Sequence, residues 1–220
     1  MACVSPISST DLKRILASRA FSRVGEPKRN RAIFAMQLCL GPRIHELLAL
    51  RCGDVLYSTG ALRPTIYFRK TKTAVPRRIE ANNPLLIRYL QPWIFRLDQL
   101  GILHANTWLF PGRCWDRPLT RQQVYVIYKA AYRELGLVRL GTHSPRKTWA
   151  VATYDYWLRQ QRAGRPVDPL VMTQRIGGWK SLESCSRYLG FTRRDGAESQ
   201  FHLYQEVTRR RPSAGQRRAG

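Results

Sequence analysis

The sequence predicts a mainly helical protein with one small antiparallel β-sheet, an α+β class of fold. Apolar residues recur at helical spacing through most of the 220 residues. Capping residues, prolines and glycines stand where these stretches begin and end. Only residues 65–79 contain short runs that are typical of strands. A hydrophobic content of 44% at this length suits a single domain with a sizeable core.

Helices are expected wherever an apolar pattern lies between a cap and a breaker. Thr120, followed three residues later by Gln123, has the form of a capping box, and Gly136 ends that helix. Pro92 is expected to bend the helix that contains it. The predicted helices are, in chain order, one capped by Ser9-Thr10-Asp11, 28–40, 42–50 (ended by Cys52-Gly53-Asp54), 84–100, 120–135, 144–162, 169–177, one opened by Ser181, and 198–208.

The sheet is expected in the middle of the chain. Residues 65–68 and 75–79 are predicted as two short strands around the basic turn 69–73. Pro76 limits its strand to an edge or a bulge. With no linker in view, we expect one domain over residues 1–208, no separate N-terminal domain, and a disordered basic tail at 209–220.

Net charge indicates the class of partner. Lys and Arg number 38 and Asp and Glu 14, so the formal net charge is +24. Residues 207–220 contain five of the arginines and no acid, so +19 remains on the rest of the chain. A body this basic favours nucleic acid as partner, with an anionic membrane surface as the alternative. No stretch is long enough to span a membrane, and we expect a cytoplasmic, nucleoid-associated protein.

Several kinds of site are not expected. The five cysteines are widely spaced without a CxxC pair, which argues against structural zinc and against a disulfide framework. His45-Glu46 begins like a zinc-protease helix, but Ala49 stands where the second histidine is required. No phosphate-binding glycine loop or nucleophile elbow occurs, so neither a metal nor a cofactor is predicted.

Three segments offer the groups that a metal-free cleavage of a phosphodiester needs. Two guanidiniums must hold the non-bridging oxygens, because negative charge develops there in the transition state. A proton donor must serve the departing oxygen, and a tyrosine can act as the covalent nucleophile. The three segments are GPRIHELLALRCGD, GTHSPRKT and GGWKSLESCSRYLG.

With these segments the sequence, over about residues 9–190, resembles the tyrosine recombinases, the family of phage-type integrases and Xer-like resolvases. The resemblance implies the catalytic fold of that family and cutting and rejoining of double-stranded DNA through a 3′-phosphotyrosyl link. It also implies a homo-oligomer, a tetramer on paired sites and a monomer when free. The residues that match the family's catalytic positions are Arg43, Lys72, His143, Arg146, Trp179 and the nucleophile Tyr188, with Glu46 in support.

Physical roles can be given to these matched residues. Glu46, three residues after Arg43, can orient the Arg43 side chain, and Lys72 on a turn can protonate the leaving oxygen. Lys70 on the same turn is the alternative to Lys72. Trp179 can donate its indole N–H to a phosphate oxygen, or it can simply pack. The basic residues predicted to bind DNA are Arg69, Lys70, Arg77, Arg78, Lys147 and Lys180.

Two prolines depart from the family pattern. Pro42 precedes Arg43 and Pro145 precedes Arg146, and each is tolerated if it lies in the first turn of its helix. A type IB topoisomerase and a catalytically idle DNA-binding protein are the competing functions. The apolar face of helix 198–208 fits a subunit-exchange helix or packing on its own domain.

Overall fold

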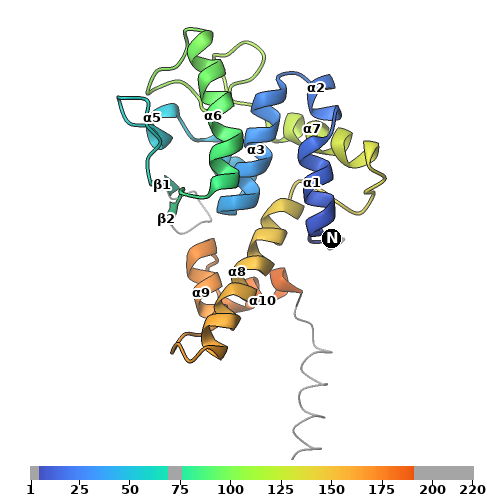
Figure 1. Cartoon of the computed structure of the whole chain (residues 1–220), viewed down its shortest axis with the longest axis vertical. Coiled ribbons are helices and arrows are strands. Elements are labelled where there is room, and N and C mark those ends of the chain that lie inside the picture. Colours follow the sequence, from blue (N-terminus) through green and yellow to red (C-terminus); the bar gives the residue numbers. More distant parts are fainter. Residues whose placement is uncertain (1–4, 69–75, 191–220) are drawn as a thin grey trace, which may run out of the picture.

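The fold is built around α3 (Pro27–Leu40), whose apolar residues occupy its whole circumference. In the computed structural model, which describes residues 5–68 and 76–190, Ile33, Phe34 and Met36 have no solvent exposure. A helix that is apolar on all sides belongs in the centre of a protein. Long neighbours cover it: α6 (Pro84–Gln99) and the first part of α8 (Ser144–Arg162) pack against α3, as Figure 1 shows in the middle of the molecule.

Shorter helices close the other side of this core. They are α1 (Ser9–Ala17), α2 (Ala20–Arg23) and α7 (Arg121–Glu134). The predicted capping box of α7 is confirmed, since Thr120 N–H donates to Gln123 Oε1 at 2.8 Å and Gln123 N–H donates to Thr120 Oγ1 at 3.2 Å. The predicted cap of α1 was wrong by one residue, because the hydroxyl of Ser8 accepts from Asp11 N–H at 3.1 Å.

The two strands pair antiparallel beside the short helix α5 (Cys52–Val55), as Figure 1 shows. Strand β1 (Thr65–Phe68) has the predicted bounds. Strand β2 (Arg77–Glu80) begins after Pro76, which has no N–H for a sheet hydrogen bond, so the predicted start at Val75 was too early. Ile66 pairs with Ile79 and Phe68 with Arg77, and these four side chains share the buried face.

Two one-turn elements follow α3. Helix α4 (Ile44–Leu48) is shorter than the predicted 42–50. The segment predicted as its terminator, Cys52-Gly53-Asp54, is itself part of a short helix, α5 (Cys52–Val55). The bounds of α4 were predicted too wide and α5 was missed, because a single turn contains too few residues to show periodicity.

A second, smaller layer of helices carries the C-terminal part of the described chain. The exposed end of α8 leads to α9 (Pro169–Gly177) and α10 (Leu182–Leu189), which lie below the main body in Figure 1. Their apolar centre is a separate cluster of Trp149, Ala150, Trp179 and Cys185. The predicted helix 198–208 and tail 209–220 lie outside the described residues. Across the described ranges, none of the helices combines the length and the apolar character needed to cross a bilayer.

Candidate active site

Arg43 is positioned at the start of α4. The chain leaves α3 through Gly41 in the left-handed region (φ +63°), and Arg43 follows as the N-cap residue. Its backbone N–H donates to Glu46 Oε2 at 2.8 Å, and its Nη1 donates to Glu46 Oε1 at 3.1 Å. Pro42 therefore lies before the cap and not, as was expected, in the first turn. Outside the helix, its missing N–H costs no helical hydrogen bond. The Arg43 side chain keeps 23% exposure.

Arg146 joins three elements at the boundary between the two apolar clusters. It lies in the first turn of α8, after Pro145, which occupies the predicted early position. Its Nη1 donates to the carbonyl oxygen of Gly41, and its Nη2 donates to that of Gly177 at 2.8 Å. The ends of α3 and α9 thus hold one guanidinium, which is only 1% exposed.

The charge of Arg146 is costly in this position. Burial, followed by the charge of Arg43, lowers the pKa of Arg146 to about 9. The side chain is still protonated at neutral pH. Among the residues that the structure describes, no carboxylate forms an ion pair with it. A buried cation that is held by neutral carbonyls is a strong attractor for an anion.

Aromatic rings form the floor beside Arg146. Trp149 stacks on Trp179 with centroids 6.3 Å apart, and the Tyr188 ring lies 5.2 Å from that of Trp179. The Arg146 guanidinium carbon is 4.5 Å from the centroid of Trp179 and 5.8 Å from that of Tyr188. At 6% exposure Trp179 is packed within this stack, so the structure brings the predicted tryptophan, arginine and tyrosine together.

The Tyr188 hydroxyl lies against the start of α8. It donates to the backbone oxygen of His143 at 3.4 Å. Partial burial, followed by the charges of Arg146 and Arg43, lowers the pKa of His143. His143 is therefore neutral at pH 7, a form in which one ring nitrogen donates and the other accepts a proton.

Glu46 connects Arg43 with a third arginine. Arg77 Nη1 donates to Glu46 Oε1 at 3.2 Å and Arg77 Nη2 donates to Glu46 Oε2 at 2.7 Å. The side chains of Arg77 and Glu46 are 5% and 2% exposed. The prediction of Arg77 as a DNA contact was wrong in its premise, because its guanidinium is committed to a buried carboxylate and does not reach the surface.

The other predicted basic contacts differ in exposure. Arg78 and Lys180 are exposed, as contacts to a DNA backbone require. Lys147 is only 8% exposed, which corrects the expectation of a surface contact there. Arg69, Lys70 and Lys72 lie outside the described residues.

An open cavity of about 520 Å³ adjoins the cluster. His143 and His45 line it on one side and Arg121, Gln122 and Tyr125 from the first turns of α7 on the other. It offers polar and cationic groups beside His143, and such a lining suits a phosphodiester backbone.

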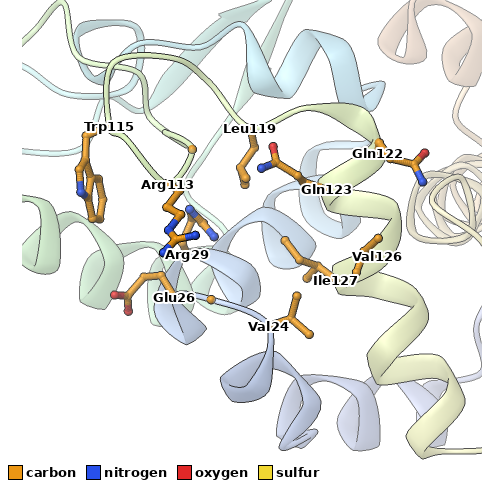
Figure 2. Close-up of a pocket in the computed structure, with 12 residues that line it drawn as sticks. Val24, Glu26, Arg29, Arg113, Trp115, Leu119, Gln122, Gln123, Val126 and Ile127 are labelled. Carbon is orange, nitrogen blue, oxygen red and sulfur yellow. The ribbon is translucent and has the colours of Figure 1, made fainter.

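A second cavity, of about 510 Å³, lies against α7 and contains none of the predicted site residues. Figure 2 shows Val126 and Ile127 of α7 across from Arg29 and Arg113. Arg29 is 7% exposed and donates from Nη1 to Pro111 O at 2.8 Å. Gln122 lines this cavity as well as the one beside His143.

The structure adds residues that sequence reasoning did not place in the site. Gly41 and Gly177 supply the carbonyls that hold Arg146, and Trp149 supports Trp179. For Arg77, which was predicted as a DNA contact, the sequence does contain a signal of burial. Ile79 is apolar two residues later in the same strand, so alternation puts both side chains on the buried face.

Comparison with known proteins indicates the family of the chain. Residues 7–193 match the sequence profile of the Phage integrase family. The probable integrase/recombinase YoeC of Bacillus subtilis (strain 168) is 26% identical over 190 residues, which are 86% of this chain and 91% of that protein.

Solved structures with a similar fold are recombinases. XerA recombinase has a TM-score of 0.63 at 19% identity, over 94% of this chain and 66% of XerA. XerH in a pre-cleavage complex with difH substrate has a TM-score of 0.59 at 21% identity, over 90% of this chain and 53% of XerH. A lambda integrase dimer bound to a COC′ core site has a TM-score of 0.57 at 17% identity, over 84% of this chain and 47% of lambda integrase. The chain thus spans less than two thirds of each of these three proteins.

The family profile covers most of the chain, and the relative from Bacillus subtilis is matched over nearly its whole length. The residues Arg43, His143, Arg146, Trp179 and Tyr188 lie together at the junction of α4, α8, α9 and α10. The protein belongs to the phage integrase family of tyrosine recombinases.

Proposed function

We propose that the protein is a site-specific recombinase that cuts and rejoins DNA strands through a covalent 3′-phosphotyrosyl link to Tyr188, without a metal ion. The observation that carries the proposal is the contact of the Tyr188 ring with both Trp179 and the buried cation Arg146. Family membership supports DNA as the substrate, and the structures of similar fold include the Tn1549 transposon integrase in complex with transposon right end DNA and lambda integrase bound to DNA.

Binding of the scissile phosphate is assigned to Arg43 and Arg146. A phosphate oxygen that contacts Arg146 supplies the counter-charge that this guanidinium lacks among the described residues. Arg43, more exposed, adds a second donor fork. Two guanidiniums then stabilise the charge that grows on the non-bridging oxygens. In other phosphoryl-transfer sites a metal ion has this role.

The chemical step exchanges one phosphodiester for another. The Tyr188 oxygen attacks phosphorus, its proton passes to neutral His143, and the bond from phosphorus to the 5′ oxygen breaks. We assign the proton for that 5′ oxygen to Lys72. Rejoining reverses each transfer: the 5′ hydroxyl attacks phosphorus and releases Tyr188. Since the phosphotyrosine conserves the bond, no external energy source is needed.

Trp179 is assigned two tasks in this scheme. Its indole N–H donates to a phosphate oxygen, and its ring supports Arg146 from a distance of 4.5 Å. In the alternative, Trp179 only packs against its neighbours and donates no hydrogen bond to phosphate.

Assembly into a tetramer on paired sites remains a prediction. The lambda integrase complex with a similar fold is a dimer.

The test is formation of a covalent adduct on a nicked suicide duplex, whose cut fragment diffuses away and traps the tyrosyl link. Candidate duplexes come from the DNA that flanks the gene. In a buffer with chelator, wild-type protein is expected to form an adduct that survives denaturing electrophoresis, and Tyr188→Phe is expected to form none. Tyr156→Phe is the matched control, because Tyr156 is a 44% exposed tyrosine outside the site.

Other outcomes separate the competing functions. Relaxation of supercoiled plasmid that lacks any specific site would indicate a type IB topoisomerase. Folded wild-type protein that binds DNA but forms no adduct would indicate a DNA-binding protein without catalysis. An adduct that forms only with added metal, or persists in Tyr188→Phe, would overturn the mechanism.

A further inference from the structure

Arg77 is a charged side chain buried at the edge of the candidate active site. Both of its Nη atoms donate to the two oxygens of Glu46, at 3.2 and 2.7 Å, which is a bidentate pair. The strand register directs the side chain inward, because Arg77 pairs with buried Phe68 and its guanidinium lies 5.1 Å from that ring.

The carboxylate that Arg77 binds is shared with Arg43. Glu46 Oε1 accepts from Arg43 Nη1 at 3.1 Å as well as from Arg77, and Oε2 accepts from the backbone N–H of Arg43 at 2.8 Å. One carboxylate therefore orients two guanidiniums. Only Arg43 is partly exposed, at 23%, whereas Arg77 is 5% exposed.

The sharing has an electrostatic consequence. A lone Arg43–Glu46 pair would be formally neutral, and its carboxylate would repel a phosphate. Arg77 supplies a second positive charge to the same carboxylate, so the group of three keeps one net positive charge, at Arg43. Because the group is largely buried, that charge is poorly screened by solvent.

We propose that Arg77 is a positioning residue whose charge neutralises Glu46, so that the guanidinium of Arg43 stays available to the scissile phosphate. The proposal rests on the function proposed above. Burial opposes ionisation of Glu46, but the hydrogen bond and charge of Arg77, with the Arg43 N–H and Arg146, hold the pKa of Glu46 at about 2. The carboxylate that Arg77 must balance is thus charged at every physiological pH. A purely mechanical role, fastening β2 to α4, is the rival explanation.

The two explanations differ for a charge-matched double variant. Arg77→Gln removes the balancing charge and is expected to slow adduct formation on the suicide duplex about tenfold to a hundredfold. Arg77→Gln with Glu46→Gln removes both charges together and leaves Arg43 positive, so its rate should recover most of the loss caused by Arg77→Gln alone. Arg77→Lys keeps the charge and should also exceed Arg77→Gln. A double variant as slow as Arg77→Gln, with both folded by circular dichroism, would overturn the proposal.

A matched control removes another paired arginine. Arg14 is bound to Asp11 at 3.0 Å on the exposed surface of α1, with its side chain 51% exposed. Arg14→Gln is expected to leave the rate of adduct formation unchanged. An equal loss in Arg14→Gln would mean that the Arg77 effect reflects net charge of the protein and not the site.

A second readout separates this proposal from the recombinase function. Inorganic phosphate is titrated into the protein while the side-chain N–H signal of Arg43, assigned with Arg43→Lys, is followed by NMR. Arg77→Gln should raise the dissociation constant for phosphate about tenfold, and the double variant should restore it. If wild type forms no adduct but this pattern holds, the recombinase function fails and the Arg77 proposal stands. If Arg77→Gln leaves the dissociation constant for phosphate unchanged, the proposal fails, whether or not the protein forms an adduct.

Discussion

At the residue scale, Glu46 shows how a buried carboxylate can remain charged. It is 4% exposed, and burial alone would favour its protonated form. The hydrogen bond and charge of Arg77, with the hydrogen bond from the Arg43 N–H and the charge of Arg146, outweigh burial and hold the pKa at about 2, below the ordinary value of 4.5. Because the folded state holds the proton less tightly than the unfolded chain, Glu46 contributes stability above pH 4.5 that is lost as the pH falls toward 2.

The pH dependence of stability tests this arrangement. Glu46→Gln should lower the free energy of unfolding at pH 6 by about 3 kcal/mol, since it leaves Arg77 buried without a charged partner. The difference from wild type should shrink by roughly 2 kcal/mol between pH 6 and pH 3, as wild type loses the contribution of its carboxylate. Urea unfolding at several pH values measures both quantities.

The control for this prediction is an exposed carboxylate. Glu183 pairs with Arg187 at 3.2 Å, but its side chain is 75% exposed. Glu183→Gln should change stability little at any pH in this range. A Glu46→Gln deficit that stays constant from pH 6 to pH 3 would contradict the lowered pKa of Glu46.

The residues of the site were predictable to different degrees. Arg43, His143, Arg146 and Tyr188 stand in short motifs whose spacing is local, so the sequence could indicate them. The burial of Arg77 and Lys147 was missed, because a basic side chain is usually exposed and only a tertiary neighbour can pair or cover it.

At the scale of elements, the end of α3 is where helix geometry and the site depend on each other. Gly41 has φ +63°, and a Cβ placed there would lie 2.2 Å from the ring of Trp149. The carbonyl of the same residue accepts a hydrogen bond from Arg146. A side chain at this position would therefore disturb both the aromatic stack and the arginine.

Gly41→Ala and Gly136→Ala form a matched pair. Gly136 also has a positive φ, +71°, but no atom lies within 4 Å of the added Cβ. Gly136→Ala should cost about 1 kcal/mol of stability from backbone strain alone. Gly41→Ala should cost a further 1–3 kcal/mol or so from the clash and should also slow adduct formation. Equal costs in urea unfolding, or an unaffected rate, would contradict the close contact with Trp149.

Helix boundaries were predictable where a cap has its own chemistry. Thr120 for α7 and Ser181 for α10 were expected as caps, and the side chain of each accepts a backbone N–H; Asp168 does the same for α9. The one-turn helices α2 and α5 were missed, since four residues show no periodicity and their formation depends on packing.

At the scale of the whole molecule, the net charge of +24 governs association with DNA. Each phosphate that a cation neutralises releases a condensed counterion, so affinity falls steeply as salt rises. For a short duplex of arbitrary sequence, we expect the affinity to fall by about a thousandfold between 50 and 200 mM salt. Fluorescence anisotropy at several salt concentrations measures the slope.

Neighbouring arginines refine this salt test. Arg78→Gln, which removes an exposed charge, should reduce the logarithmic slope by about one. Arg77→Gln removes a buried charge one residue away and should leave the slope unchanged. A shallow slope for wild type, or equal effects of both variants, would contradict the division between surface and site charges.

The helical class, the hairpin, the basic character and the order of the catalytic motifs could all be derived from the linear sequence, because each depends on composition or on residues a few positions apart. The burial and the hydrogen-bond partners of Arg77 and Arg146 could not be derived in this way. Arg146 is held by a carbonyl 105 positions away and by another 31 away, and Arg77 reaches a carboxylate 31 positions away. Only the packing of α3, α8, α9 and β2 brings these groups together and removes the water that would otherwise screen their charges.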